Sequence, residues 1–465
     1  MFTFTWSRFT GLLMVLIICF TGCTATDSSE KVIRTQIEAQ ITNLLQTWYP
    51  VSLDTVHGGY LSDLSYDWKP NGRQSKMLVS QARHVWTSSQ AAMFLHDDYY
   101  RQVAEHGYKF LRDVMQDTVY GGFYLLRDQS GKSVGSFFSR SVTDEKTAYS
   151  HAFTIYALAS YYQLTGDKEA LDLAIKTFHW LDEHSWDPVN MGYVDRMNRE
   201  GVWFGKAGLY KNARRGLARD YKDQNSSIHI MEAFTQLYTV WPDEHLRTRL
   251  QQMLEIIRDK IVGDKPYLTM FLELDWTPIT FRDSSAVVRE ANSYYDNVSF
   301  GHDVETAFLM LEASHTLGIE NDTKTLAVGK SMVDHALANG WDDSLGGFYY
   351  EGYYFNNVDT CTIINSSKEW WVQAEGLNSL LLMHKLYPND PKYLKGFEKM
   401  WSYIDTYLID HENGGWYTDG LDNSPKMKKA NKAGIWKADY HNYRALMNTD
   451  KMLRGDFELT DHAGH

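Results

Sequence analysis

Cysteine and proline are scarce in this sequence, and both shortages limit the structures that the chain can form. Among 465 residues there are 3 cysteines, and two of them, Cys19 and Cys23, stand near the N-terminus. Cys361 is therefore alone in the rest of the chain, which excludes a disulfide framework and a cysteine metal site. Only 9 prolines interrupt the chain, and apolar residues recur over long segments at the spacing of a helix. Helix is therefore the predicted dominant element.

Positive charge is also in short supply. Lys and Arg number 46 against 59 Asp and Glu, which gives a formal net charge of -13 at pH 7. So acidic a surface argues against a nucleic-acid partner and against charge-driven binding to anionic lipid. The chain does contain 43% apolar and 14% aromatic residues, enough to bury a large core.

The N-terminus carries an apolar run, residues 12–20, that is too short to span a membrane comfortably. It follows Arg8, and small residues stand directly before Cys23. This pattern predicts a bacterial lipoprotein signal peptide at residues 1–22, lipidation of Cys23 and a polar tether at residues 23–30. A simple membrane anchor is the alternative. The expected location is the bacterial cell envelope, where the lipid would anchor the protein in the periplasm or at the outer membrane.

A short phrase recurs along the chain: an aspartate, three residues, a pair of glycines and an aromatic residue. Neighbouring copies begin 63 to 70 residues apart, except for one gap about twice as long. A sixth copy that has lost its glycines is therefore expected near residues 266–275. The five recognisable copies, of which the third keeps one glycine, are residues 54–60, 117–123, 187–193, 342–348 and 410–416.

Six units of about 70 residues each have room for two helices and a glycine-turned hairpin, and such a repeat buries its apolar face only against its neighbours. Closing six helix pairs into a ring predicts an all-α fold. It would be an (α/α)6 barrel over residues 31–455, with short β-hairpins in the loops, a flexible tail at 456–465 and a monomeric state. An open solenoid is the alternative. Twelve predicted helices fit the barrel: residues 31–48, 79–95, 98–115, 146–165, 168–183, 226–240, 244–261, 302–317, 324–339, 369–385, 391–408 and 440–453.

The first candidate for chemistry is the segment in which Gly301 leads into a predicted helix. His302 and Glu305 lie three residues apart and so share one face of that helix. The Glu305 carboxylate would hold one nitrogen of the His302 ring and leave the other free to take a proton. His229 and Glu232 repeat this spacing on another predicted helix. Among 17 histidines, about one such pair is expected by chance, so the spacing alone is weak evidence.

Other polar residues open predicted inner helices, where a barrel favours apolar side chains. Arg83 either offers a fixed fork to sugar oxygens or forms a salt bridge in the core. Tyr149 is either a donor in a pocket or a core tyrosine with a satisfied hydroxyl. Asn225 is either a ligand contact or the N-cap of its helix.

Trp371 and Glu375 lie four residues apart on one helix face. Together they suit a sugar, which stacks its C–H face on the indole and bonds its hydroxyls to the carboxylate. The structural alternative is a core tryptophan, with Glu375 bonded to a backbone donor. His441 opens the last predicted helix, where Asp439 is a candidate N-cap. Taken alone, His441 fits a structural role, but the whole set indicates a sugar site.

At these residues the sequence resembles the N-acylglucosamine 2-epimerase superfamily, and within it the cellobiose and mannobiose 2-epimerase branch. The resemblance runs from about residue 32 to residue 453. It implies an (α/α)6 barrel in which His229, His302 and His441 are the acid/base set. It also implies a sugar pocket lined by Arg83, Tyr149, Asn225, Trp371, Glu375 and Trp436. The phrases that carry it are residues 82–86, Asn225 with His229 and Glu232, residues 299–305, residues 370–375, and Trp436-Lys437 with residues 440–442.

Two positions depart from the family pattern. Phe308 stands where a tryptophan usually follows the histidine, and Asp439 stands where a proline is common. Both departures leave the core chemistry intact, but they put the identity of the sugar in doubt.

The set suggests a 2-epimerase that acts on a mono- or disaccharide and needs neither a metal nor a cofactor. After the ring opens, one histidine would remove the C2 proton to form an enediolate, and another would return a proton to the opposite face. His302 and His441 are the predicted pair. His229, supported by Glu232, would assist ring opening, or stabilise the enediolate together with Arg83.

Several alternatives use the same residues. An aldose–ketose isomerase forms the same enediolate, and an N-acylglucosamine 2-epimerase differs in the sugar. A glycoside hydrolase or lyase would recruit Glu375 with an aspartate. A glycan-binding lipoprotein would bind without chemistry. A divalent metal held by His229, Glu232, His302 and Glu305 is also conceivable, since imidazole and carboxylate suit several metals.

Overall fold

The computed structural model describes the backbone of residues 10–138, 142–212, 217–355 and 358–457, and the side chains of the same residues except 10–28 and 211–212. The predicted signal peptide, Cys23 and most of the tether therefore lie outside the described side chains, and the tail lies outside them beyond residue 457. These assignments stay predictions. Within the described part of the chain, no helix combines the length and apolarity needed to cross a membrane.

Six inner helices form a closed ring. Each contacts the next one along the chain, and the last contacts the first, so the ring has no open end. Their side chains are buried nearly all round, because each inner helix packs against two ring neighbours and at least one outer helix. The inner helices are α2 (Leu78–Leu95), α4 (Ala148–Thr165), α6 (Gln224–Val240), α9 (Phe300–Thr316), α11 (Trp370–Leu386) and α13 (Tyr440–Arg454).

An outer helix packs against each inner one. Five outer helices begin at an aspartate whose side chain accepts a hydrogen bond from a backbone N–H of the first turn. The first outer helix, α1, packs against the last inner helix, α13, and so joins the two ends of the described chain. The outer helices are α1 (Thr10–Val51), α3 (Asp98–Phe110), α5 (Lys168–His184), α7 (Glu244–Ile256), α10 (Thr323–Asn339) and α12 (Pro391–Tyr403).

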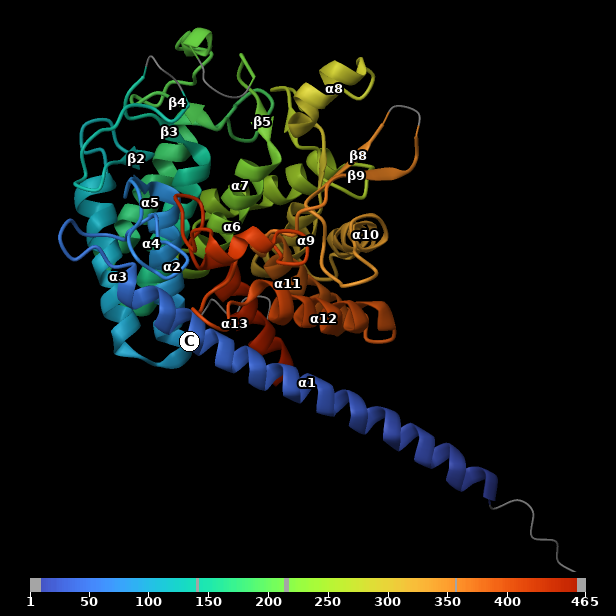
Figure 1. Cartoon of the computed structure of the whole chain (residues 1–465). Helices are drawn as coiled ribbons and strands as arrows, with labels where there is room; N and C mark the ends of the chain where they lie inside the picture. Colours follow the sequence, from blue (N-terminus) through green and yellow to red (C-terminus); the bar gives the residue numbers. More distant parts are fainter. Residues whose placement is uncertain (1–9, 139–141, 213–216, 356–357, 458–465) are drawn as a thin grey trace, which may run out of the picture.

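Short strand pairs gather at one end of the barrel, which is the upper end in Figure 1. The strands β1, β3, β5 and β7 each run directly into an inner helix, so the N-terminal turns of those helices face this end. Antiparallel pairing joins β1 (Lys76–Met77) with β2 (Leu126–Arg127), β3 (Lys146–Thr147) with β4 (Arg196–Met197), β5 (Lys222–Asp223) with β6 (Phe271–Leu272), and β7 (Val298–Ser299) with β8 (Glu351–Tyr354), which also pairs with β9 (Cys361–Asn365).

The predicted barrel is confirmed, and the closed contact between α13 and α2 excludes the open solenoid. All twelve predicted helices are present, and β6 lies where the degenerate sixth copy was expected. The short helix α8 (Ala286–Asn292) at the strand end was not predicted, because its few residues carry no clear apolar period. Short π or 3-10 turns complete the chain: η1 (Leu111–Met115), η2 (Leu209–Asn212), η3 (Ile257–Val262), η4 (Ser293–Tyr295), η5 (Ile404–Leu408) and η6 (Pro425–Lys429).

The aspartate of each recognisable glycine phrase forms a buried ion pair. Its partner is a lysine that stands shortly before the next inner helix, so the pair ties the turn after an outer helix to the entry of an inner one. One carboxylate oxygen also accepts backbone N–H groups of its own turn. The nitrogen–oxygen distances are 2.9 Å for Lys76–Asp54, 3.2 Å for Lys146–Asp117, 2.8 Å for Lys222–Asp187, 2.6 Å for Lys368–Asp342 and 2.6 Å for Lys432–Asp410.

These ion pairs predict a large stability loss on removing one lysine. Lys368 Nζ also lies 3.1 Å from Asp422, and its side chain is fully buried. We expect Lys368→Met to lower the free energy of unfolding by about 3 to 5 kcal/mol, because two buried carboxylates lose their cation. Chemical denaturation checks this. The control, Lys395→Met at an exposed position of α12, should change stability by about 0.5 kcal/mol or less. Equal effects of the two substitutions would contradict a structural role for the pairs.

Candidate active site

The predicted site residues come from the N-terminal part of the inner helices, except Trp436, which precedes α13. Tyr149 is the second residue of α4, His302 the third of α9 and His441 the second of α13. Arg83 and His229 lie one turn further into α2 and α6. Because these turns meet at one end of the barrel, the positive ends of several helix dipoles point into the same space. That field favours a negative charge on a bound molecule.

His302 is held by Ser299 and not by Glu305. Nδ1 of His302 lies 2.7 Å from Oγ of Ser299. When Nδ1–H donates this hydrogen bond, Nε2 is the nitrogen that can take a proton. Glu305 instead accepts a hydrogen bond of 2.5 Å from Nη2 of Arg444. The prediction that Glu305 orients His302 is therefore wrong. The two residues share a helix face, but each side chain turns toward a different neighbouring element.

His441 is held by Glu375. Nδ1 of His441 lies 2.6 Å from Oε1 of Glu375, which is therefore bonded to a histidine and not to a backbone donor. The indole of Trp371 contacts both candidate bases: its centroid is 4.7 Å from the His302 ring and 5.8 Å from the His441 ring. The fold thus brings together two histidines that are far apart in the sequence.

His229 pairs with Glu232, as predicted. Nδ1 of His229 lies 2.7 Å from Oε2 of Glu232, and both side chains are buried. The other oxygen of Glu232 accepts hydrogen bonds from Tyr440 and from Nη1 of Arg444. The His229 ring packs edge-on against Tyr149, at 5.3 Å between centroids, which brings the pair next to the other site residues.

Arg444 is the functional residue that sequence reasoning missed. Its guanidinium contacts Glu232 through Nη1, and it contacts Glu305 and Glu375 through Nη2, at 2.5 Å and 2.8 Å. It is 1% exposed. A continuous buried chain of contacts therefore runs from His441 through Glu375, Arg444 and Glu232 to His229. The sequence feature that could have identified Arg444 is its position three residues after His441, on an inner helix where a buried charge needs a partner.

Burial sets the protonation of this network. Burial raises the pKa of Glu375 to about 7 against the opposing effect of Arg444, and burial together with Glu375 raises the pKa of Glu305 to about 7. Burial also acts on Glu232, but Arg444 and His229 outweigh it and lower its pKa to about 2. Glu232 is therefore ionised at neutral pH. Because Glu305 and Glu375 interact, they titrate as a pair.

The two candidate bases are neutral at physiological pH. Burial first, and then the charges of His229 and Arg83, together lower the pKa of His302 to about 3. Burial, with Arg83 and Arg444, also lowers the pKa of His441 well below its ordinary value. A neutral imidazole accepts a proton and does not release one readily, so a proton donor at this site needs a second group behind the ring.

A cavity of about 840 Å³ at the strand end reaches His302 but is not lined by His441 or His229. From the predicted set, Tyr149, Asn225, His302 and Trp436 line it. Asn225 is not an N-cap, because Asp223 caps α6. Trp436 is 39% exposed and packs edge-on against Phe137, at 5.7 Å. The volume lies in the range of about 300 to 1,000 Å³ typical of small-molecule sites.

Arg83 lies between the cavity and the buried network. Its two terminal nitrogens donate to the hydroxyl of Tyr149 and to the carbonyl of Trp436, each at 3.1 Å. The guanidinium stacks on the Phe153 ring, at 4.4 Å from its centroid. Arg83 thus forms no ion pair among the described residues, which favours the predicted role as a cation for substrate oxygens.

Glu305, Glu375 and His441 form a cluster whose ligand atoms lie within 4.8 Å of one another, the kind of group that could hold a metal. It differs from the cluster considered on sequence grounds, which included His229 and His302. The guanidinium of Arg444 already lies against both carboxylates of this cluster. Both carboxylates of this cluster therefore already have a cationic partner.

The profile of the N-acylglucosamine 2-epimerase family matches residues 59–445. The chain belongs to this family. A cellobiose 2-epimerase of Ruminococcus albus is 30% identical over 415 residues, which are 89% of this chain and 97% of the relative. The solved structure of cellobiose 2-epimerase from Bacillus thermoamylovorans is 26% identical with a TM-score of 0.75, covering 90% of this chain and 99% of that one. A D-mannose isomerase of Marinomonas mediterranea is 24% identical, over 90% of this chain and 98% of the relative.

Membership in the N-acylglucosamine 2-epimerase family makes this chain an isomerase of carbohydrates.

The two residues that depart from the family pattern, Phe308 and Asp439, lie in different parts of the barrel. Phe308 is 1% exposed and belongs to the hydrophobic core. Asp439 precedes α13 without capping it through its side chain, and it lies 3.3 Å from Nδ1 of His84. Neither residue lines the cavity.

The network predicts that Arg444 positions the reacting groups. We expect Arg444→Met to lower turnover by about a hundredfold or more, because Glu375 and Glu232 lose the group that fixes their orientation. Arg444→Lys should recover part of the activity, since it keeps the charge without the fork. The control is Arg454→Met near the exposed end of the same helix. Wild-type turnover in Arg444→Met, in a protein shown to be folded by circular dichroism, would contradict this role.

Proposed function

We propose that this protein is a sugar 2-epimerase that interconverts C2 epimers at the reducing end of a disaccharide of the cellobiose or mannobiose type. The single observation that carries the proposal is the convergence of His302 and His441 on Trp371, beside a cavity large enough for more than one sugar unit. Epimerisation at C2 needs a base and an acid on opposite faces of one carbon. These two rings supply them.

The first step is ring opening, which exposes the C1 aldehyde and makes the C2 proton acidic. His229, with its Nδ1–H held by ionised Glu232, is placed beside Tyr149 to move the proton between the C1 hydroxyl and the ring oxygen. Arg83 then faces the oxygens on which negative charge develops. A fixed guanidinium in a site shielded from water stabilises an enediolate strongly.

Proton transfer at C2 follows from the protonation states. Neutral His302 takes the C2 proton on Nε2, and the C–H electron pair moves into the enediolate. His441 gives its Nε2 proton to the opposite face of C2 and receives a proton on Nδ1 from Glu375, 2.6 Å away. After the step His302 is charged and Glu375 is ionised. The number of protons is unchanged, so the reverse reaction uses the same groups with their roles exchanged.

An aldose–ketose isomerase is the second candidate, and the likeness to a D-mannose isomerase favours it. It forms the same enediolate but returns the proton to C1. A hydrolase is less well supported, because Glu375, the carboxylate that it would recruit, is already bound by Arg444 and His441.

Product analysis in heavy water tests the proposal. Cellobiose, mannobiose and free mannose are each incubated with the protein, and the products are separated and scored by NMR. We expect deuterium at C2 and a 2-epimer from a disaccharide. A ketose as the main product would assign the isomerase instead. If no sugar gives either C2 exchange or a product, both the epimerase and the isomerase are overturned.

His302→Ala and His441→Ala should each lower turnover by about 10² to 10⁴-fold while the fold is kept. The control His411→Ala, at an exposed histidine, should leave turnover unchanged.

The proton on Glu375 predicts that activity falls at alkaline pH. The active form has neutral His302, neutral His441 and protonated Glu375. Because the pKa of Glu375 is raised to about 7, that proton is lost as the pH rises through this value, and kcat/KM should fall above about pH 7. Glu375→Gln cannot release a proton, so it should be much slower and should lack this limb. An unchanged limb in the residual activity of Glu375→Gln would assign the titration to another group.

A further inference from the structure

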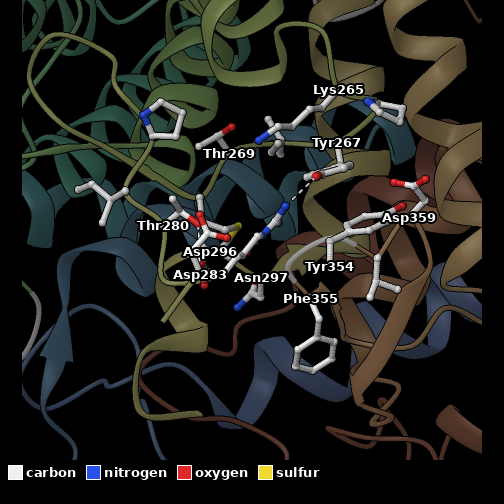
Figure 2. A pocket seen from close by; sticks show the side chains of 17 residues that line it. Lys265, Tyr267, Thr269, Thr280, Asp283, Asp296, Asn297, Tyr354, Phe355 and Asp359 are labelled. Carbon is white, nitrogen blue, oxygen red and sulfur yellow. Dashed lines mark hydrogen bonds between the residues drawn. The ribbon is translucent and has the colours of Figure 1, made fainter. Parts of the chain in front are cut away.

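The two sides of the catalytic site are supported in different ways. On one side, the chain that leads into β7 is anchored by Arg282, whose terminal nitrogens donate to the hydroxyl of Tyr267 and to the backbone carbonyl of Asp296, each at 3.0 Å. Arg282 lines a pocket of about 560 Å³, and Figure 2 shows Tyr267 and Asp296 on opposite sides of it. These bonds support the strand from which Ser299 holds His302.

The other side, the indole of Trp371, depends on one hydrogen bond. An indole has a single donor, and Nε1 of Trp371 donates to Oε2 of Glu369 at 2.9 Å. The indole is buried, and its centroid lies 4.7 Å from the ring of His302 and 5.8 Å from the ring of His441. The orientation that the indole presents to the two rings therefore depends on Glu369.

The opposite edge of the same indole lies against the first turn of α9. A Cβ at Gly301 would stand 2.8 Å from Cζ3 of Trp371, closer than van der Waals contact, so glycine is what allows this approach. Tyr350 packs edge-on against the indole, at 6.0 Å between centroids. The indole is thus held by a hydrogen bond at its nitrogen edge and by packing at its benzene edge.

The backbone around Glu369 is fixed on both sides. The N–H of Lys368 donates to Oδ1 of Asp419 at 2.6 Å, and the N–H of Trp370 donates to the carbonyl of Thr418 at 3.1 Å. Glu369 is the N-cap residue of α11, but its side chain caps no backbone N–H of that helix. An N-cap side chain usually bonds its own first turn. Here the carboxylate bonds the indole two residues further on.

This hydrogen bond does not require an ionised carboxylate. Burial raises the pKa of Glu369 to about 7, with Asp419 and Glu351 adding to the effect and the bond from Trp371 and the charge of Lys437 opposing it. A carboxyl group that is protonated on one oxygen still accepts on the other. The indole therefore keeps its acceptor on both sides of neutral pH, and an amide oxygen at the same place would serve equally.

We propose that Glu369 is a positioning residue, which holds the indole of Trp371 in the orientation that contacts both His302 and His441. The proposal rests on the proposed function, since these two rings are its acid and base. The lining of the catalytic cavity does not include Glu369, so its carboxylate acts on the reaction through the indole.

The test compares Glu369→Leu with Glu369→Gln. Leucine accepts no hydrogen bond, and we expect it to lower kcat about tenfold with KM within about twofold, because the indole turns and the two rings lose their alignment on C2. Glutamine offers an amide oxygen in the same place and should recover most of this loss. The control is Glu320→Leu, at an exposed residue on the loop after α9.

A double-mutant cycle shows whether Glu369 acts through the indole. Trp371→Phe keeps an aromatic ring but has no N–H, so in its background Glu369→Leu should change kcat by less than about twofold. A loss of about tenfold in both backgrounds would assign Glu369 a role that does not pass through Trp371, and the proposal would be overturned.

NMR of the indole N–H groups measures the hydrogen bond without catalysis. In protein whose tryptophans carry a nitrogen isotope, Trp371→Phe identifies the signal of Trp371 by its loss. We expect Glu369→Leu to shift this signal and to speed its proton exchange with water, because the N–H loses its acceptor. Glu369→Gln should leave the signal close to that of the wild type.

The failures of the two proposals are distinguishable. If no sugar exchanges at C2, the proposed function fails, and the NMR comparison still decides whether Glu369 holds the indole. A signal that shifts in Glu369→Leu but not in Glu369→Gln supports that hold. If a sugar is epimerised but Glu369→Leu keeps either the wild-type kcat or the wild-type indole signal, the positioning role is overturned while the epimerase stands.

Discussion

The guanidinium of Arg444 lies between three carboxylates that would otherwise repel one another inside the barrel. Glu232 and Glu375 each hold a histidine, so neither can move away without losing its ring. A single cation cannot neutralise three acids. Burial, together with the repulsion between the carboxylates, raises the pKa of Glu305 and Glu375 to about 7. This arrangement lets a neutral imidazole act as an acid, because a proton is stored directly behind it.

The barrel supplies the geometry that this network needs. All six inner helices run in the same direction through the ring, so their first turns meet at the strand end. The buried Lys–Asp pairs fix those turns relative to the preceding outer helices. Residues from α6, α9, α11 and α13 can therefore contact one guanidinium although they are spread over more than 200 positions of the chain. Helix dipoles at the same end add a field that favours an anionic intermediate.

Loops at the strand end shape the access to the chemistry. Aromatic side chains from separate loops line the catalytic cavity, among them Phe137, Tyr294 and Trp436. The segment that carries β6 forms part of the wall between this cavity and the pocket around Arg282. This segment belongs to the repeat that has lost its glycine pair. Its connection to the next inner helix, α9, includes α8 at the strand end.

The sequence by itself determined the repeat, the twelve helices of the barrel and the histidines of the site. The glycine phrases and the helical period fix local structure through short-range sterics and burial, and the pair His229–Glu232 is local as well. The partners of His302, Glu305 and Glu375 were decided only by the tertiary structure. Spacing along one helix limits which side chains share a face, but the choice between Ser299, Arg444 and His441 as partners depends on how neighbouring helices are placed. Arg444 shows the same limit, since its role comes from three acids on three other helices, and the proton affinities follow from burial that exists only when the ring is closed.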